Sequence, residues 1–97
     1  MINMENGAAV ADPTSAEDCF DLGMMYSAGA GLPVDLVQAH KWFNIAAMRG
    51  HQGAAQLRRE IAEQMSDAEI GHAQRAARDW LKANPQPSLQ ASIRAAA

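Results

Sequence analysis

A short glycine- and proline-containing segment, residues 29–35, divides two stretches that have a helical pattern and restricts how they can be arranged. The segment reads Gly-Ala-Gly-Leu-Pro-Val-Asp. Its glycines can adopt a positive φ, and its proline prevents one continuous helix from running through it. Asp35, at its end, can cap the N-terminus of a second helix. Because so short a connection joins them, the two helices must fold back on each other, and the sequence predicts an antiparallel hairpin.

The first helix of this hairpin is predicted to begin after Thr14 or Ser15. Either residue can act as the N-cap, since Glu17 and Asp18 stand three residues after them, and acidic groups suit the positive end of the helix dipole. Phe20, Gly23, Met24 and Ser27 share one face of this helix, with Cys19, Leu22 and Tyr26 beside it. If Met24 faces inward, Met25 points about 100° away. Met25, with Asp21 and Tyr26, is therefore expected to mark the exposed side.

The second helix is expected to run to about Arg49 and to end at Gly50, a position where glycine commonly terminates helices. Its predicted buried face consists of Ala39, Trp42, Phe43, Ala46 and Ala47. Small residues here, together with Gly23 on the first helix, allow two helix backbones to approach closely. The chain holds 21 alanines and few aromatic residues, so Phe20, Trp42, Phe43 and Trp80 are the candidates for the bulk of the core.

Two further helices are predicted after Gly50. Leu57, Ile61 and Met65 recur every four residues in the third, and Ser66 with Glu69 forms a capping box before the fourth. The apolar stripe of the fourth helix contains Ile70, Ala73, Ala77, Trp80 and Leu81, and Asn84-Pro85 ends it. We therefore expect a helical domain over residues 15–84, preceded by a disordered segment, 1–14, and followed by a flexible tail, 85–97.

Residues with fixed spacings extend from the first predicted helix to the start of the third. They are Leu22, Gly23, Tyr26, Gly29, Gly31, Asp35, Ala39, Trp42, Ala46, Ala47, Gly50 and Ala54. This pattern resembles the Sel-one-like repeat (SLR) family, whose units are helix-turn-helix modules related to tetratricopeptide repeats. The resemblance implies an all-α fold with two antiparallel helix hairpins stacked as a short right-handed superhelix. Arg58-Arg59 replaces the leucine-glycine pair in the second hairpin, which is expected to be a degenerate cap.

The resemblance also implies a protein-binding scaffold without catalytic chemistry. In tetratricopeptide-like folds the first helix of each unit lines a concave groove, so the first and third helices are expected to provide the binding face. The residues that this analogy selects are Asp21, Met25, Tyr26, Gln56 and Arg59. The expected partner is another protein or peptide, and its identity is open.

The charge distribution leaves two alternatives open. Residues 1–39 carry six acids and no base, whereas residues 40–97 carry eight bases and five acids, so oppositely charged ends could support a homodimer or larger homo-oligomer. The second alternative, less favoured than a protein partner, is nucleic acid bound by a basic strip on the third and fourth helices. The strip would comprise Arg58, Arg59, Arg75, Arg78 and Lys82. The expected i,i+4 ion pairs Arg59–Glu63 and Arg75–Asp79 would reduce the positive electrostatic potential of this strip.

Catalytic, metal and cofactor sites are not expected. His40, His51 and His72 have no i,i+3 or i,i+4 partner among themselves, and His51 is expected to form a hydrogen bond in a turn. Glu17 and Asp21 lie four residues apart, but no nucleophile or glycine cradle adjoins them in sequence. Cys19 is the one cysteine, so no internal disulfide can form, which favours the cytoplasm, or the periplasm if a leader has been removed. No membrane-spanning segment is expected.

Overall fold

The computed structural model describes residues 15–85, and these residues form four α-helices. In chain order the helices are α2 (Ala16–Ala28), α3 (Leu36–Met48), α4 (Ala54–Ala62) and α5 (Asp67–Ala83). The described part of the chain contains no strand, so the predicted all-α class is confirmed. Thr14 and the predicted terminal segments, apart from Pro85, lie outside the described residues.

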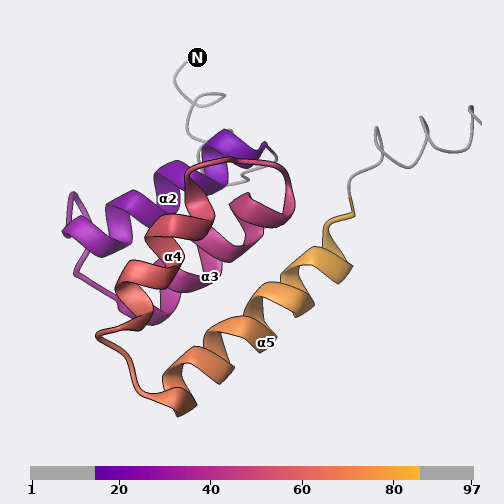
Figure 1. Cartoon of the computed structure of the whole chain (residues 1–97). Coiled ribbons are helices and arrows are strands. Elements are labelled where there is room, and N and C mark those ends of the chain that lie inside the picture. The colour runs from indigo at the N-terminus through magenta and orange to yellow at the C-terminus, as the bar shows by residue number, and fades with distance from the viewer. Residues whose placement is uncertain (1–14, 86–97) are drawn as a thin grey trace, which may run out of the picture.

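The helix α3 is the centre of the fold. It packs against α2, α4 and α5, and the most extensive helix–helix packing is between α2 and α3, the predicted first hairpin. Figure 1 shows α2 and α5 on different sides of the pair formed by α3 and α4. The helices α4 and α5 both pack on α3 more extensively than on each other. The second pair of helices therefore covers the first hairpin mainly through α3.

The helix ends form where the capping residues predict them. Ser15 accepts a hydrogen bond from the Asp18 N–H at 3.0 Å, and Asp35 accepts one from the Gln38 N–H at 3.1 Å. At the start of α5, Ser66 and Glu69 form the full capping box. Gly29 and Gly50, with φ of 72° and 100°, follow α2 and α3 in the left-handed conformation that glycine adopts most easily.

Two adjoining groups of buried side chains form the core. One contains Cys19, Trp42, Ile45, Ala46, Ala54 and Ala77, and the other contains Ala39, Phe43 and Ile61. Phe20 and Tyr26 of α2 pack against both groups. A Cβ atom at Gly23 would lie 2.6 Å from the Phe43 ring, so the missing side chain is what allows this ring to rest on the α2 backbone. The predicted close approach of these helices is confirmed.

The attachment of α5 to α3 depends on an aromatic pair near the C-terminal end of α5. The rings of Trp42 and Trp80 meet edge to face, with centroids 5.2 Å apart. The Arg49 guanidinium lies 4.9 Å from the Trp80 ring centroid, and its Nη2 donates to the Asn84 carbonyl oxygen. On the other flank, Lys41 Nζ lies 4.5 Å from the Trp42 ring. Such cation–π contacts add to the apolar packing.

The third helix is shorter than the periodicity predicts. It ends at Ala62, and Met65 follows it, although Met65 still packs against the core group that contains Phe43. Gln64 and Met65 donate to the carbonyls of Ile61 and Ala62, three residues earlier. These bonds tighten the last turn and satisfy helix carbonyls before the chain enters α5. Within residues 15–85, none of the helices has the length and apolar character needed to cross a membrane.

Candidate interaction surface

The residues predicted to bind a partner lie on α2 and α4, with unequal exposure. Asp21, Gln56 and Arg59 are exposed, whereas Met25 and Tyr26 are half-buried. Tyr26 packs against both core groups, so much of its side chain serves the fold. Gln56 and Arg59 form side-chain hydrogen bonds within α4. The binding role of all five residues stays a prediction.

Met24 shares a face with Phe20 and Gly23 in the predicted helix, but in the structure it does not face inward. Its side chain is 42% exposed, whereas Cys19 and Gly23 are buried. Each residue of a helix is rotated about 100° from the previous one, so the inward position of Gly23 turns Met24 toward the surface. The spacing of Cys19 and Gly23, four residues apart, is the sequence signal that could have identified this inward side.

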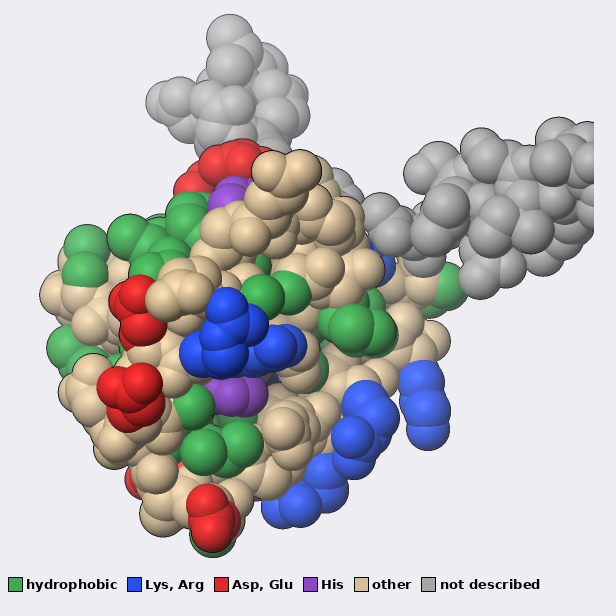
Figure 2. All heavy atoms as spheres, in the orientation of Figure 1, with side chains coloured by type: hydrophobic (Ala, Val, Ile, Leu, Met, Phe, Trp, Pro, Cys, Tyr) green, Lys and Arg blue, Asp and Glu red, His purple; other side chains and the backbone are tan. Residues whose placement is uncertain are grey.

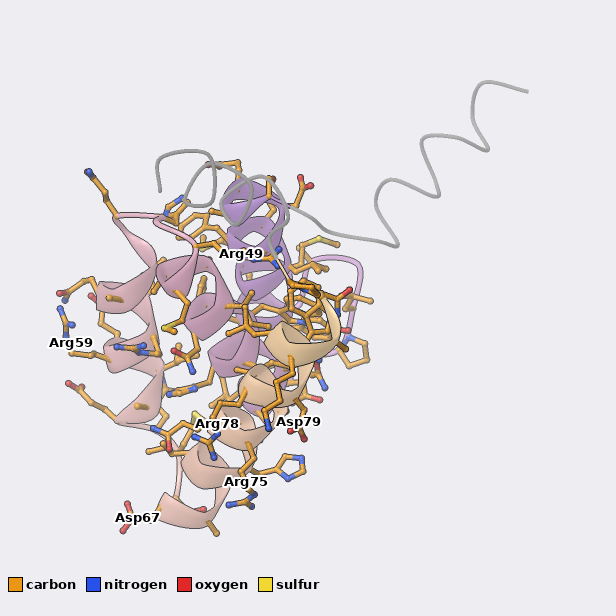
Figure 3. The ribbon with its side chains drawn as sticks, turned by 90° about the vertical axis from the view of Figure 1, so that its right-hand side faces the viewer. Arg49, Arg59, Asp67, Arg75, Arg78 and Asp79 are labelled. Atoms are coloured by element: carbon orange, nitrogen blue, oxygen red, sulfur yellow. The ribbon has the colours of Figure 1, made fainter. Side chains whose placement is uncertain are left out.

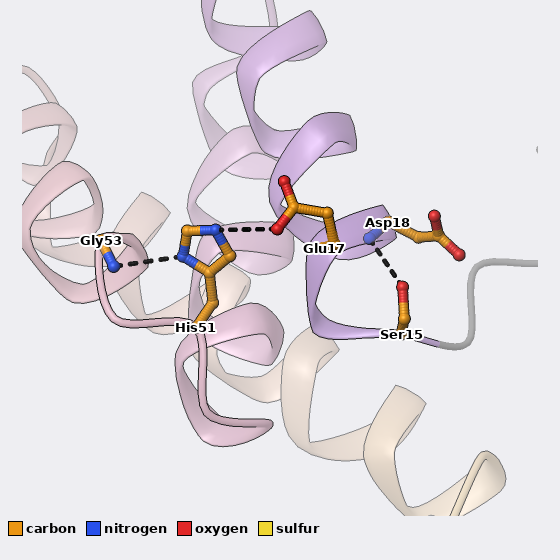
Figure 4. Close-up of polar contacts among 5 residues, drawn as sticks. All are labelled: Ser15, Glu17, Asp18, His51 and Gly53. Atoms are coloured by element: carbon orange, nitrogen blue, oxygen red, sulfur yellow. Dashed lines mark hydrogen bonds and ion pairs between the residues drawn. The ribbon is translucent and has the colours of Figure 1, made fainter.

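A junction around His51 joins α2 to the turn that precedes α4. The imidazole stacks on Phe20, with centroids 3.9 Å apart and an angle of 7° between the rings. Its Nδ1 accepts from the Gly53 N–H at 3.1 Å, so Nε2 carries the proton in neutral His51. That Nε2 lies 3.5 Å from Glu17 Oε1, as Figure 4 shows. The expected hydrogen-bonding role of His51 is confirmed. The spacing of the repeat residues did not predict that His51 also contacts Phe20 and Glu17 of α2.

This junction identifies the flank of α2 that is turned toward the α3–α4 connection. Phe20 and Glu17 both contact His51, so they lie on that flank. Met24 follows Phe20 by four residues and therefore lies one turn further along the same side. The exposed thioether of Met24 thus lies on the flank of α2 that faces this connection, while Met25 is rotated away from it.

The outer face of α4 carries a chain of polar contacts. Arg59 Nη2 donates to Gln56 Oε1 at 2.9 Å, and Gln56 Nε2 donates to Glu60 Oε2 at 3.0 Å. Figure 3 shows Arg59 on the side of α4 that is turned away from α5. The predicted Arg59–Glu63 ion pair is absent from the described residues, because the guanidinium is directed to Gln56 instead. Arg59 and Gln56, two of the predicted residues, therefore act as one unit.

Beneath α4 lies His40, a buried polar side chain of α3. It is 3% exposed, and its Nδ1 has no hydrogen-bond partner within the described part of the chain. Arg58 Nη1 donates to Asn44 Oδ1 at 2.7 Å nearby. Burial, and secondly the Arg58 charge, lower the pKa of His40 below 6.5. His40 is therefore neutral at pH 7 and belongs to the interior rather than to the binding face.

Reactive groups do not converge in the described residues. No three His, Cys, Asp or Glu side chains within residues 15–85 are placed to hold a metal ion together. Cys19 is fully buried, and burial raises the pKa of its thiol despite the opposing charge of Arg49. A buried thiol held in the neutral form is a poor nucleophile. What the α2 and α4 surface offers is an exposed thioether beside side chains of both charge signs.

The model of the Sel1 repeat family matches residues 16–51, from the first residue of α2 to His51. Proteins of this family are typically non-catalytic, and Sel1 repeats generally mediate protein–protein interactions. No curated protein and no solved structure matches the chain.

Proposed function

We propose that this chain, in which residues 16–51 match the Sel1 repeat, is a small adaptor or regulatory scaffold that binds another protein through α2 and α4. The observation that carries the proposal is the exposed Met24 on the flank of α2 nearest the α3–α4 connection. Methionine adapts its shape to varied apolar partners, which suits a recognition surface. The partner is a peptide or domain, and the protein acts in the cytoplasm.

The chemistry of the surface specifies the kind of partner. Met24 offers an apolar contact, Asp21 lies at its edge, and the Arg59–Gln56–Glu60 chain offers donors and acceptors on α4. An apolar centre within a polar rim is the usual anatomy of a protein interface. We expect a partner segment that places an apolar side chain on Met24 and a carboxylate within reach of Arg59.

The test begins with affinity capture of the full-length chain from its native cell extract and identification of a stoichiometric partner by mass spectrometry. Calorimetry with that partner then compares Met24→Asp with Met48→Asp. Met48 is 68% exposed and lies at the end of α3, so it provides a matched control. We expect Met24→Asp to weaken binding at least about tenfold, because a carboxylate would be desolvated at the contact.

Met48→Asp should leave the affinity within about twofold. Equal affinity of both variants would show that the partner binds elsewhere. Arg59→Gln adds a second measurement on α4 that does not touch the core. Tyr26→Ala is a poor probe of the surface, because Tyr26 packs against both core groups and its truncation would destabilise the fold as well.

A further inference from the structure

The outer face of α5 carries a stripe of positive charge. Arg75, Arg78 and Lys82 are exposed and follow one another at intervals of three and four residues, which places them on one side of a helix. Ala73 and Ala77 are buried on the opposite side. Figure 2 shows Lys and Arg side chains in a row along the edge of the molecule that α5 forms, and Figure 3 shows Arg75 and Arg78 along the helix.

These three charges, the basic stripe, are not neutralised within the described residues. The predicted Arg75–Asp79 ion pair is absent from residues 15–85. Asp79 lies near the stripe and lowers its charge, but three bases against one acid leave a positive face. A charged helix face of this kind, without an internal partner, is available to another molecule.

The first turns of α2 carry the complementary charge. Asp18 and Asp21 are exposed and form no ion pair with any described residue, while Glu17 faces His51. Figure 1 places α2 and α5 on different sides of α3 and α4, so the two faces of one molecule cannot meet. They can meet between molecules, because every copy carries both faces.

We propose that the chain self-associates head to tail, with the basic stripe of α5 in one copy against the acidic turns of α2 in the next copy. The inference rests on this charge complementarity and does not depend on the proposed adaptor function. From Arg75 to Lys82 the stripe spans about 10 Å of helix, a length that the long flexible side chains can match to the first turns of α2. Since the two faces differ, the contact is heterologous and extends into chains rather than closing a two-fold dimer.

Self-association of this kind uses one of the helices that the proposed partner would use. Asp21 lies three residues before Met24 on α2, so a second copy seated there would cover part of the partner surface. The contact is rich in exposed charges, which contribute little individually and are screened by salt. It is therefore weak and reversible, and a partner that binds α2 with higher affinity would displace the second copy.

The test is the molar mass of the purified full-length chain by sedimentation equilibrium over a wide concentration range. At about 20 mM NaCl the mass should rise with concentration, and at about 500 mM NaCl association should weaken at least tenfold. Two charge-reversed proteins, Arg75→Glu/Arg78→Glu/Lys82→Glu and Asp18→Lys/Asp21→Lys, should each stay monomeric at low salt. An equimolar mixture of the two should associate again, because each contact between one variant and the other pairs opposite charges.

Far-ultraviolet circular dichroism of each reversed protein should show the helix content of the wild type. Asp21→Asn, a milder change, should weaken association without reversing charge, and Glu63→Lys on α4 should leave the association constant within about twofold.

A monomer at low salt and high concentration would overturn the proposal, as would unchanged association in either reversed protein. Retardation of a DNA or RNA fragment by a monomeric wild type, lost in the α5 variant, would assign the stripe to nucleic acid instead. If Met24→Asp loses affinity for the partner but still self-associates, partner binding and self-association depend on different residues, and the two proposals are tested separately.

Discussion

The absence of a side chain at Gly23 leaves room for the ring of Phe43 between α2 and α3. A side chain there would collide with Phe43 Cδ1 and Cε1 at 2.6 Å. Phe43 is 1% exposed and has Phe20 beside it, with ring centroids 5.6 Å apart, so its ring has little room to move. The glycine therefore determines how closely α2 and α3 approach, in spite of the low helix propensity of glycine.

Replacing Gly23 with Ala is expected to lower the free energy of unfolding by roughly 1 to 2 kcal/mol. Overpacking costs about 1–3 kcal/mol, and the better helix propensity of alanine offsets up to about 1 kcal/mol of it. Gly71→Ala in α5 is the matched control, because its new Cβ would meet only the mobile end of Arg75 at 3.3 Å. Urea unfolding should show Gly71→Ala neutral or more stable, and a stabilised Gly23→Ala would refute the packing argument.

His40 is expected to make stability depend on pH. Its pKa in the folded protein lies below 6.5, so the unfolded chain takes up a proton first as the pH falls. The free energy of unfolding should therefore decrease from pH 6.5 downward, until the folded pKa is reached. Urea unfolding at a series of pH values tests this, with His40→Gln as the comparison.

The variant, which cannot take up this proton, should show a smaller decrease over the same pH range. An NMR titration of the His40 ring proton gives an independent reading, and its midpoint should lie below 6.5. Arg58→Gln should raise that midpoint, since the Arg58 charge is one of the two causes of the shift. A midpoint at or above 6.5 would contradict the buried, neutral state of His40.

Among the elements, α5 has the simplest attachment. It is the longest helix, with 17 residues, and α3 is its main neighbour. Its buried residues are the small Ala73 and Ala77, so the large contact area comes from the half-buried Trp80 and from Leu81. The helix is well formed at its start by the Ser66–Glu69 capping box, but its hold on the rest of the fold depends on Trp80.

Trp80→Ala is expected to destabilise the protein by roughly 2 to 3 kcal/mol, less than for a fully buried tryptophan. The variant loses the edge-to-face contact with Trp42 and the guanidinium of Arg49 over the ring. Hydrogen exchange should show faster exchange throughout α5, while the amides of α2 and α3 remain protected. Equal acceleration in all four helices would mean that α5 cannot detach by itself.

At the scale of the whole molecule, the core is shared among all the helices of the described chain. One buried group draws Cys19 from α2, Trp42 from α3, Ala54 from α4 and Ala77 from α5. Because this group takes residues from every one of these helices, the matched repeat and the helices after it stabilise each other. This is how repeat proteins acquire stability, through contacts between neighbouring units.

We therefore expect the wild-type chain to unfold in a single cooperative transition. Tryptophan fluorescence reports the α3–α5 contact, and far-ultraviolet circular dichroism reports all the helices. In urea the two signals should give the same midpoint within experimental error. An earlier midpoint by fluorescence would show that α5 leaves before the hairpin of α2 and α3 unfolds.

The sequence alone determined what depends on local chemistry. Ser15, Asp35 and Ser66 cap helices because their side chains reach backbone N–H groups three residues away. Gly29 and Gly50 follow helices because positive φ favours glycine, and the spacing of the repeat residues was enough to indicate the family. These predictions required no knowledge of distant parts of the chain.

Which side of each helix is buried depends on contacts between residues that are far apart in the sequence. Met24 is exposed because Gly23 meets Phe43, a contact across 20 residues of sequence that helical periodicity could not specify. His51 contacts Phe20 and Glu17 of α2, because side-chain partners depend on the neighbours that folding supplies. Local rules set where helices begin and end, whereas long-range packing sets their orientation and therefore the surface that another molecule meets.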